Sequence, residues 1–284
     1  MIKSRKIKKV YTSKPTLEGA GVHLKRAFGF NEVPEFDPFL LLDDFRSDNP
    51  QYYLKGFPWH PHRGIETITY MLRGNVEHGD SMGNKGVIGS GDVQWMTAGS
   101  GIVHQEMPKG DEAGYNWGFQ LWANLPRSHK MMDPRYRDVK KDQIPEIETA
   151  AGVKIKIIAG EVNGTKGPVK DIVIDPEYLD VTVPARTEFI HPAKSGHTVL
   201  AYVTGGTGYF SDEKKMFSNN NLVLFNDGEQ LSVTTENEPV SFLLISGMPI
   251  KETVAWHGPI VMNTRKELEV AFEEYENGTF IKHK

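Results

Sequence analysis

The sequence predicts an all-β protein of sandwich or barrel type with one helix near the C-terminus. The first observation is a series of short apolar runs, most of them bounded by glycine, at residues 65–72, 118–125, 153–160, 197–206, 221–227 and 240–247. The second is an alternation of period two, as in Val153, Ile155 and Ile157 against two intervening lysines. The third is the presence of turn dipeptides between the runs, namely Gly110-Asp111, Asn163-Gly164 and Asp227-Gly228. Together these patterns are typical of β-sandwiches and β-barrels.

The helix is predicted at about residues 264–277. Thr264 followed by Glu267 has the spacing of a capping box, and Gly278 supplies a stop signal. The apolar residues between these signals fall near one stripe: Leu268, Val270, Ala271, Phe272 and Tyr275. This is the one segment where helical signals dominate.

Two domains are expected within the 284 residues. Segment 126–148 is polar, punctuated by proline and poor in β-branched residues, which makes it the best candidate linker. The halves also resemble each other, because 68–99 and 198–233 each pair a glycine-ended apolar strand with a second strand beside a Gly-Asp or Asp-Gly turn. We therefore predict an N-terminal domain at 1–135 and a C-terminal domain at 136–284.

Composition restricts the class of function. With 33 basic and 37 acidic residues the net charge is −4, which gives no electrostatic basis for binding DNA or RNA directly. No apolar run is long enough to span a membrane, and no apolar segment of signal-peptide type follows the basic start. The absence of cysteine excludes disulfides, thiolate metal sites and a cysteine nucleophile. These features favour a cytoplasmic protein.

Two pairs of potential metal ligands stand at two-residue spacing. His60 and His62 form one pair, and His104 and Glu106 form the other. Residues i and i+2 of a β-strand point to the same face, so two neighbouring antiparallel strands would bring all four side chains together. Three imidazoles and a carboxylate suit iron(II), manganese, cobalt, nickel, copper or zinc. Spacing alone does not distinguish this site from unrelated surface histidines.

The residues around these pairs carry a family resemblance. His60 and His62, followed by Glu66 after three residues and later by His104, resemble the motifs of cupins. The resemblance is closer to the pirins, a family of cupins with two such domains. It rests on four strings in family order: 37-DPFLLLDDF-45, 58-PWHPHRGIETITYMLRG-74, 92-DVQWMTAGSGIVHQEMP-108 and 256-WHGPIVMNT-264.

The resemblance implies two cupin-type β-barrel (jelly-roll) domains arranged as a bicupin, with metal in the N-terminal domain only. It carries the metal ligands onto His60, His62, His104 and Glu106, with Fe(2+) as the usual metal. Members of the family are described as quercetin 2,3-dioxygenases and, in eukaryotes, as nuclear iron-dependent transcriptional cofactors. The small-molecule partners implied here are a flavonol-like aromatic substrate and O2.

The identity of the acid ligand has two candidates. Glu66 would be in phase with His60 and His62 on an unbroken strand, and it occupies the usual cupin position. Glu106 occupies the position that resembles pirins. We favour Glu106 as the ligand and expect Glu66 to orient a histidine. Thr97 stands where cupins usually have proline, a feature that resembles pirins.

Three further residues are candidates for the pocket. Trp59 directly precedes a ligand, although most tryptophans here also suit a barrel core. His78 lies in a turn-rich connection and is read as a loop or supporting histidine rather than a ligand. Gln120 follows the second motif and either reaches the metal-bound species or fills the core.

The leading functional hypothesis is a quercetin 2,3-dioxygenase-type reaction. The resemblance implies that Glu106 takes the proton of the flavonol 3-hydroxyl, and that O2 then opens the ring with release of carbon monoxide. The alternative is a non-enzymatic, iron-dependent regulatory or redox-sensing protein that binds a protein partner. A third hypothesis, a sugar isomerase or small-ligand binder, fits the pirin-like strings less well.

Overall fold

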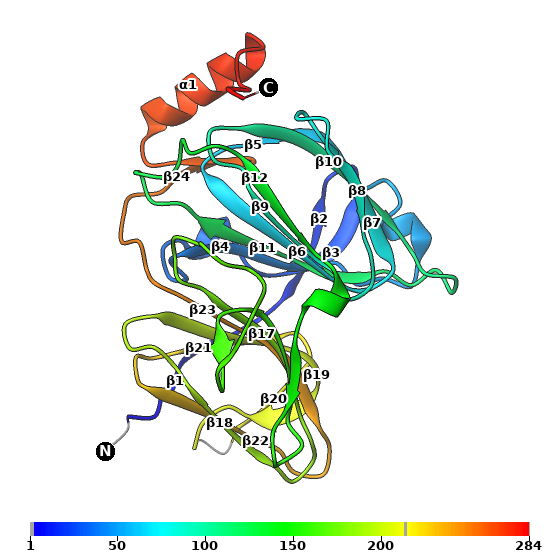
Figure 1. Cartoon of the computed structure of the whole chain (residues 1–284), viewed down its shortest axis with the longest axis vertical. Helices are drawn as coiled ribbons and strands as arrows, with labels where there is room; N and C mark the ends of the chain where they lie inside the picture. Colours follow the sequence, from blue (N-terminus) through cyan, green and yellow to red (C-terminus); the bar gives the residue numbers. More distant parts are fainter. Residues whose placement is uncertain (1–2, 213–214, 284) are drawn as a thin grey trace. The chain divides into compact units, whose positions relative to one another are not determined.

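The computed structural model describes residues 3–212 and 215–283 as two compact units built mainly of antiparallel strands (Figure 1). The first unit comprises Lys14–Lys141 and Ile250–Lys284, and the second comprises Met1–Ser13 and Asp142–Pro249. The prediction of an all-β fold with a short C-terminal helix is confirmed.

The first unit contains two sheets that enclose a cavity. A seven-stranded sheet has the order β12-β9-β6-β11-β4-β3-β2, and a four-stranded sheet has the order β5-β10-β7-β8. Short 3₁₀ turns, η1 (Phe30–Glu32) and η2 (Pro50–Tyr52), lie in the connections. The strands are β2 Lys14–Glu18, β3 Val22–Phe28, β4 Phe39–Asp44, β5 Phe57–His62, β6 Ile65–Arg73, β7 Asn75–Asp80, β8 Lys85–Ile88, β9 Val93–Thr97, β10 Ile102–Lys109, β11 Trp117–Asn124 and β12 Arg135–Val139.

The second unit is built on one ten-stranded sheet. Its main path runs β1-β21-β19-β23-β17-β14-β13, and β18, β20 and β22 join beside it. The strands are β1 Ile7–Thr12, β13 Glu146–Glu148, β14 Lys154–Ala159, β17 Glu177–Val183, β18 Glu188–Pro192, β19 Thr198–Tyr209, β20 Met216–Ser218, β21 Asn221–Phe225, β22 Gln230–Thr234 and β23 Val240–Gly247. A small ribbon pairs β15 Glu161–Val162 with β16 Thr165–Lys166.

The interior of the second unit is filled by apolar side chains. Alternate residues of β14, β17, β19 and β23 point inward and form one continuous core. Five phenylalanines belong to this core: Phe189, Phe210, Phe217, Phe225 and Phe242. No group of three metal-ligating side chains occurs among the described residues of this unit.

The C-terminal segment adds a β-ribbon and a helix to the first unit. The ribbon pairs β24 (Ala255–His257) with β25 (Ile260–Met262), and the helix α1 spans Arg265–Glu276. The predicted capping box is present, since Thr264 and Glu267 exchange their two hydrogen bonds. Leu268 and Ala271 are buried against the ribbon, whereas Val270 and Tyr275, placed on the same predicted stripe, are exposed.

The two compact units do not coincide with the predicted domains 1–135 and 136–284. The N-terminal strand β1 pairs with β21 of the second unit, and residues 250–284 return to the first unit. The chain passes between the units at residues 141 and 142, inside the predicted linker 126–148. That segment is not irregular throughout, because β12 pairs with β9 and β13 pairs with β14, with η3 (Lys141–Gln143) between them.

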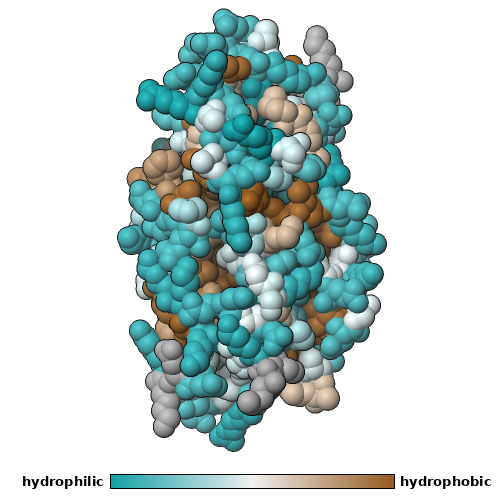
Figure 2. Space-filling view, turned by 90° about the vertical axis from the view of Figure 1, so that its left-hand side faces the viewer, coloured by the Kyte–Doolittle hydropathy of each residue, from teal (hydrophilic) through white to brown (hydrophobic). Residues whose placement is uncertain are grey.

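Hydrophilic residues cover most of the face drawn in Figure 2, with apolar residues in smaller areas between them. This distribution accords with a chain in which 25% of residues are charged. Within residues 3–212 and 215–283, no helix has the length and apolar character needed to cross a membrane.

Candidate metal centre and cavity

Three histidines converge at one end of the cavity in the first unit. Strands β5 and β10 are antiparallel neighbours, with His104 opposite His60 and Ile102 opposite His62. The Nε2 atom of His60 lies 3.0 Å from that of His62 and 3.0 Å from that of His104. The potential ligand atoms of all three lie within 4.8 Å of one another. The two-residue spacing thus places these rings on one face of the paired strands.

The hydrogen bonds of two of these rings determine which nitrogen carries the proton. Nδ1 of His60 lies 2.8 Å from the carbonyl of Pro58, and Nδ1 of His62 lies 2.9 Å from the carbonyl of Pro259. A carbonyl oxygen only accepts, so each Nδ1 must donate and each Nε2 of a neutral ring must present a lone pair. Lone pairs 3.0 Å apart repel unless a cation lies among them. This donor set therefore fits one divalent cation.

Burial keeps the three imidazoles neutral. Loss of solvent lowers the pKa of His60 and of His104, and it lowers the pKa of His62 to about 3. The neighbouring imidazoles lower the pKa values of His62 and His104 further. Since a histidine must be deprotonated at the coordinating nitrogen to bind a metal, the cluster is ready for a cation at neutral pH.

Glu106 lies next to the histidines on the same face of β10. Its Oε2 is 4.0 Å from Nε2 of His104, and its Oε1 accepts a hydrogen bond of 3.2 Å from the Thr69 hydroxyl. Desolvation raises the pKa of Glu106 to about 7, and the bond from Thr69 offsets only part of that effect. The carboxyl group can therefore gain and lose a proton near neutral pH.

Glu66 lies on the opposite face of its sheet. Gly64 has a φ of +79°, which ends the strand register of β5 before β6 begins. Glu66 is thus out of phase with His60 and His62. Its carboxylate accepts bonds of 3.0 Å from Nε1 of Trp95 and 2.5 Å from Oγ1 of Thr97. These contacts replace the expected contact between Glu66 and a histidine.

The cavity beside the histidines has a volume of about 620 Å³. Trp59 and Gln120, two of the pocket candidates, line it, and so do Thr69 and Glu106. Trp59 stands at the surface with 51% of its area exposed. Most of the remaining lining is apolar: Leu24, Phe30, Leu41, Phe45, Phe57, Val76, Trp122 and Trp256. A cavity of this size and character suits a drug-sized aromatic molecule.

His78, the third pocket candidate, lies on β7, the strand that pairs with β10. It is opposite Glu106 in the pairing of β7 with β10 and is buried. Its Nε2 lies 3.0 Å from Nε2 of Gln94, and its ring stacks on Tyr136. His78 therefore packs between strands and is not part of the cavity lining.

The sequence patterns gave no role to the ribbon β24–β25, although it forms part of the cavity wall. Trp256, Gly258 and Pro259 line the cavity, and the Pro259 carbonyl receives the His62 hydrogen bond. Trp256 also makes an edge contact with Phe30 at 5.5 Å between ring centroids. The string 256–264 signals family membership, but its position in space follows only from the fold.

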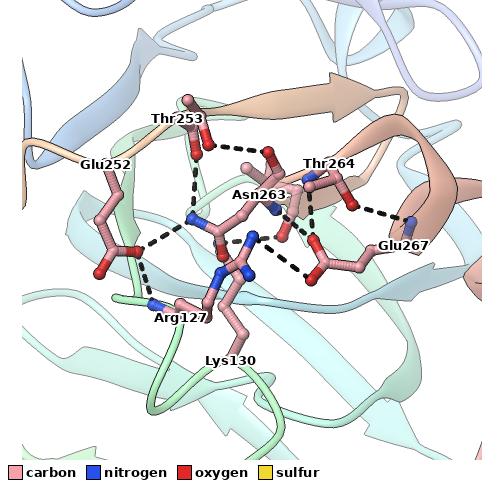
Figure 3. A network of polar contacts seen from close by, with 8 residues as sticks. Arg127, Lys130, Glu252, Thr253, Asn263, Thr264 and Glu267 are labelled. Atoms are coloured by element: carbon pink, nitrogen blue, oxygen red, sulfur yellow. Dashed lines mark hydrogen bonds and ion pairs between the residues drawn. The ribbon is translucent and has the colours of Figure 1, made fainter.

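A polar network, with Lys130 and Asn263 buried in it, connects this ribbon to neighbouring segments of the first unit (Figure 3). Nζ of Lys130 donates to the carbonyls of Gly64 and Val261 and to Oδ1 of Asn124, at 2.8, 3.0 and 2.7 Å. The side chain of Asn263 donates to Glu252 and to the Thr253 carbonyl. Lys130 thereby joins the turn after His62 to strand β25.

Comparison with known proteins agrees with the fold. Residues 21–123 match the Pirin family model, and residues 178–281 match the model described as the pirin C-terminal cupin domain. A pirin-like protein of Caulobacter vibrioides is 44% identical over 97% of this chain and 99% of its own length. A pirin-like protein of Solanum lycopersicum is 44% identical over 92% of this chain and 88% of its own length.

The solved structures give the same result. The crystal structure of a quercetin 2,3-dioxygenase from Acinetobacter baumannii has a TM-score of 0.90 and 31% identity, and the match covers 98% of both chains. The predicted bicupin architecture is confirmed by this match and by the two family models. From the sequence relationship, the shared fold and the two matched domains, we conclude that this chain belongs to the pirin family.

Proposed function

We propose that this chain is an iron(II)-dependent dioxygenase that cleaves a flavonol or similar enol with O2 and releases carbon monoxide. The observation that carries the proposal is the convergence of the Nε2 atoms of three neutral histidines beside a carboxyl group of raised pKa, at the end of a largely apolar cavity. The fold shared with a quercetin 2,3-dioxygenase supports the same reaction class.

His60, His62, His104 and Glu106 would hold the metal. Three imidazoles and one carboxylate form a mixture of nitrogen and oxygen donors that suits iron(II). When bound, the iron supplies the electronic link between an enolate and dioxygen. The carbonyls of Pro58 and Pro259 orient the first two imidazoles.

Glu106 would act as the general base. A substrate hydroxyl placed beside the histidines comes within reach of the carboxylate, which takes its proton. The raised pKa makes Glu106 a more effective base than an ordinary glutamate, because it lies close to the working pH. The Thr69 hydroxyl has one proton to donate, and it lies 3.2 Å from Oε1 of Glu106 and 2.7 Å from Oε1 of Gln120, so these two acceptors compete for it.

The apolar lining would hold the planar rings of the substrate and exclude water. Trp122 makes an edge contact with His62 at 5.0 Å and lies 5.7 Å from the ring of Trp256. These aromatic surfaces extend from the histidines along the cavity. A dry site strengthens the electrostatic interactions within it and protects reactive species from hydrolysis.

The test is oxygen consumption by the iron(II)-reconstituted protein with quercetin, beside a His60→Ala variant. We expect one O2 consumed and one carbon monoxide released per quercetin, and we expect neither from the variant. If a protein that holds one iron per chain shows no turnover of any flavonol, the dioxygenase proposal is wrong. Capture of a specific protein partner by that same protein would then favour the regulatory alternative.

A further inference from the structure

A row of polar side chains crosses the cavity face of the large sheet. Arg26 of β3 is opposite Asp43 of β4, Asp43 is opposite Gln120 of β11, and Gln120 is opposite Thr69 of β6. Directly opposed residues of antiparallel strands share a face, and all four line the cavity. Their neighbours in the cavity wall are mainly apolar, so this row determines where a ligand can form polar contacts.

The row has two ends of different chemistry. At one end, Thr69 contacts Glu106 beside the histidines. At the other end, Arg26 binds Asp43 through two bonds of 2.8 and 2.7 Å and contacts Oε1 of Glu18 at 2.8 Å. Gln120 uses its amide oxygen to accept from Thr69, so its NH2 group is left to face an acceptor on a ligand.

The charged end carries a net negative charge. Among the described residues that line the cavity, Arg26 is the only lysine or arginine. Its positive charge is paired with the carboxylates of Asp43 and Glu18. A ligand carboxylate or phosphate would meet two carboxylates and no uncommitted cation. A ligand hydroxyl would instead find carboxylate lone pairs that the bonds from Arg26 leave open, because a carboxylate accepts about four hydrogen bonds.

We propose that Asp43, held by Arg26, is the specificity-determining residue for the distal end of the substrate and selects a neutral aromatic ring bearing a hydroxyl group. The proposal rests on the proposed function and names the substrate class of the same cavity. Glu18 and Arg26 act as positioning residues, since they contact Asp43 or each other and set the local charge.

The separation of the two ends suits a three-ring molecule. Thr69 and Asp43 stand two strand spacings apart, which corresponds to roughly 10 Å. A flavonol whose enol lies beside Glu106 therefore extends its aryl ring toward Asp43. A hydroxyl at the 4′ position of that ring is the group best placed to donate to the carboxylate.

The test is calorimetric binding to the iron(II)-loaded protein without oxygen. Three probes differ only at the 4′ position: 3-hydroxyflavone, its 4′-hydroxy derivative and its 4′-carboxylate derivative. We expect the 4′-hydroxy derivative to bind about tenfold tighter than 3-hydroxyflavone and the carboxylate to bind about tenfold weaker, as the net strength of a charge-assisted hydrogen bond implies.

Asp43→Asn should change the order of affinity among the three probes rather than lower the affinity for all of them. Removing one negative charge leaves the charge of Arg26 less fully neutralised. The affinity for the 4′-carboxylate derivative should therefore rise about tenfold, and the difference in affinity between the 4′-hydroxy derivative and 3-hydroxyflavone should become smaller. Asp44→Asn is the matched control. Asp44 is the next residue of the same strand and binds Arg46 at 2.5 Å, but it is not part of the cavity lining.

Each outcome bears on the inference separately from the reaction. If Asp43→Asn keeps the order of the wild type, or if the wild type binds the three probes equally, the inference is wrong even when quercetin is cleaved. If both aspartate variants change the order alike, the effect is structural and the inference is also wrong. If the iron-loaded wild type binds none of the probes and consumes no oxygen with quercetin, the proposed function is wrong and the inference with it.

Discussion

Glu66 and Glu106 are both buried carboxyl groups in one unit, yet their surroundings prepare them for different roles. Burial raises the pKa of Glu66, and the hydrogen bonds that it accepts from Thr97 and Trp95 offset part of that rise. Glu106 accepts one bond from the neutral hydroxyl of Thr69 and faces the cavity. The environment of Glu106 suits a group that exchanges a proton, because fewer hydrogen-bond donors stabilise its ionised form.

The raised pKa of Glu106 predicts a pH dependence for the metal-free protein. Its folded pKa of about 7 exceeds the ordinary 4.5, so the folded state binds more protons than the unfolded state between these values. This group therefore stabilises the fold below pH 4.5 and loses that contribution as pH rises through 7. The expected loss is about 3 kcal/mol.

The measurement is urea unfolding of chelator-treated protein at pH 5 and pH 8, beside Glu106→Gln. The variant lacks the titrating group, so its free energy of unfolding should fall less between the two pH values than that of the wild type. Equal falls in the two proteins would show that the pKa of Glu106 in the folded state is close to its ordinary value.

At the level of residues, the sequence predicted the grouping of the three histidines because period-two spacing is a local property. It misplaced Glu66 because the phase argument assumed an unbroken strand from His60 onward. The left-handed conformation of Gly64 interrupts that strand. A glycine in the sequence permits this conformation but does not require it.

At the level of elements, the ribbon β24–β25 shows how a distant segment completes the site. It supplies the Pro259 carbonyl to His62 and the side chain of Trp256 to the cavity. The helix α1 adds a second attachment, because Arg63 pairs with Glu274 at 2.7 Å and donates to the Phe280 carbonyl at 2.9 Å. The residue after His62 is thus fixed by the C-terminal segment.

Replacement of Lys130 should weaken this attachment. In Lys130→Met, the carbonyls of Gly64 and Val261 and the side chain of Asn124 each lose a donor within a buried site. We expect the free energy of unfolding to fall by about 3 kcal/mol. Arg127→Met, a neighbour in Figure 3, should cost less than about 0.5 kcal/mol, because its 3.7 Å ion pair with Glu267 involves an exposed side chain.

Urea unfolding of both variants measures the two changes. A loss for Lys130→Met no greater than that for Arg127→Met would contradict a stabilising role for the buried ammonium group. A pronounced loss of iron content in Lys130→Met alone would extend that role to the orientation of His62.

The local elements were more predictable than their assembly. The helix was predicted from its capping box, and strands β6, β11, β14, β19, β21 and β23 were predicted from apolar runs that end in glycine or a turn. The sequence did not predict that β1 belongs to the second unit and residues 250–284 to the first. These segments join their units through contacts between residues that are distant in the sequence. Periodicity carries no information about such contacts.

On the scale of the whole molecule, the two units use similar strands for different purposes. The second unit fills its interior with a continuous apolar core that includes five phenylalanines. The first unit places imidazoles, a carboxyl group and a polar row on inward positions and keeps a cavity. Burial of polar groups is costly, so the first unit is expected to depend on a ligand for part of its stability.

Metal binding should therefore stabilise the first unit selectively. All four proposed ligands belong to that unit, and a metal present at 100 times its dissociation constant adds about 2.7 kcal/mol to the state that binds it. In hydrogen exchange of the full chain, iron(II) under nitrogen should slow the amides of β5 and β10 while leaving those of β19 and β23 unchanged. His60→Ala, measured in the same way, should abolish the difference. An equal gain of protection in both units would contradict a metal effect confined to the first unit, and no gain in either would contradict metal binding by these four side chains.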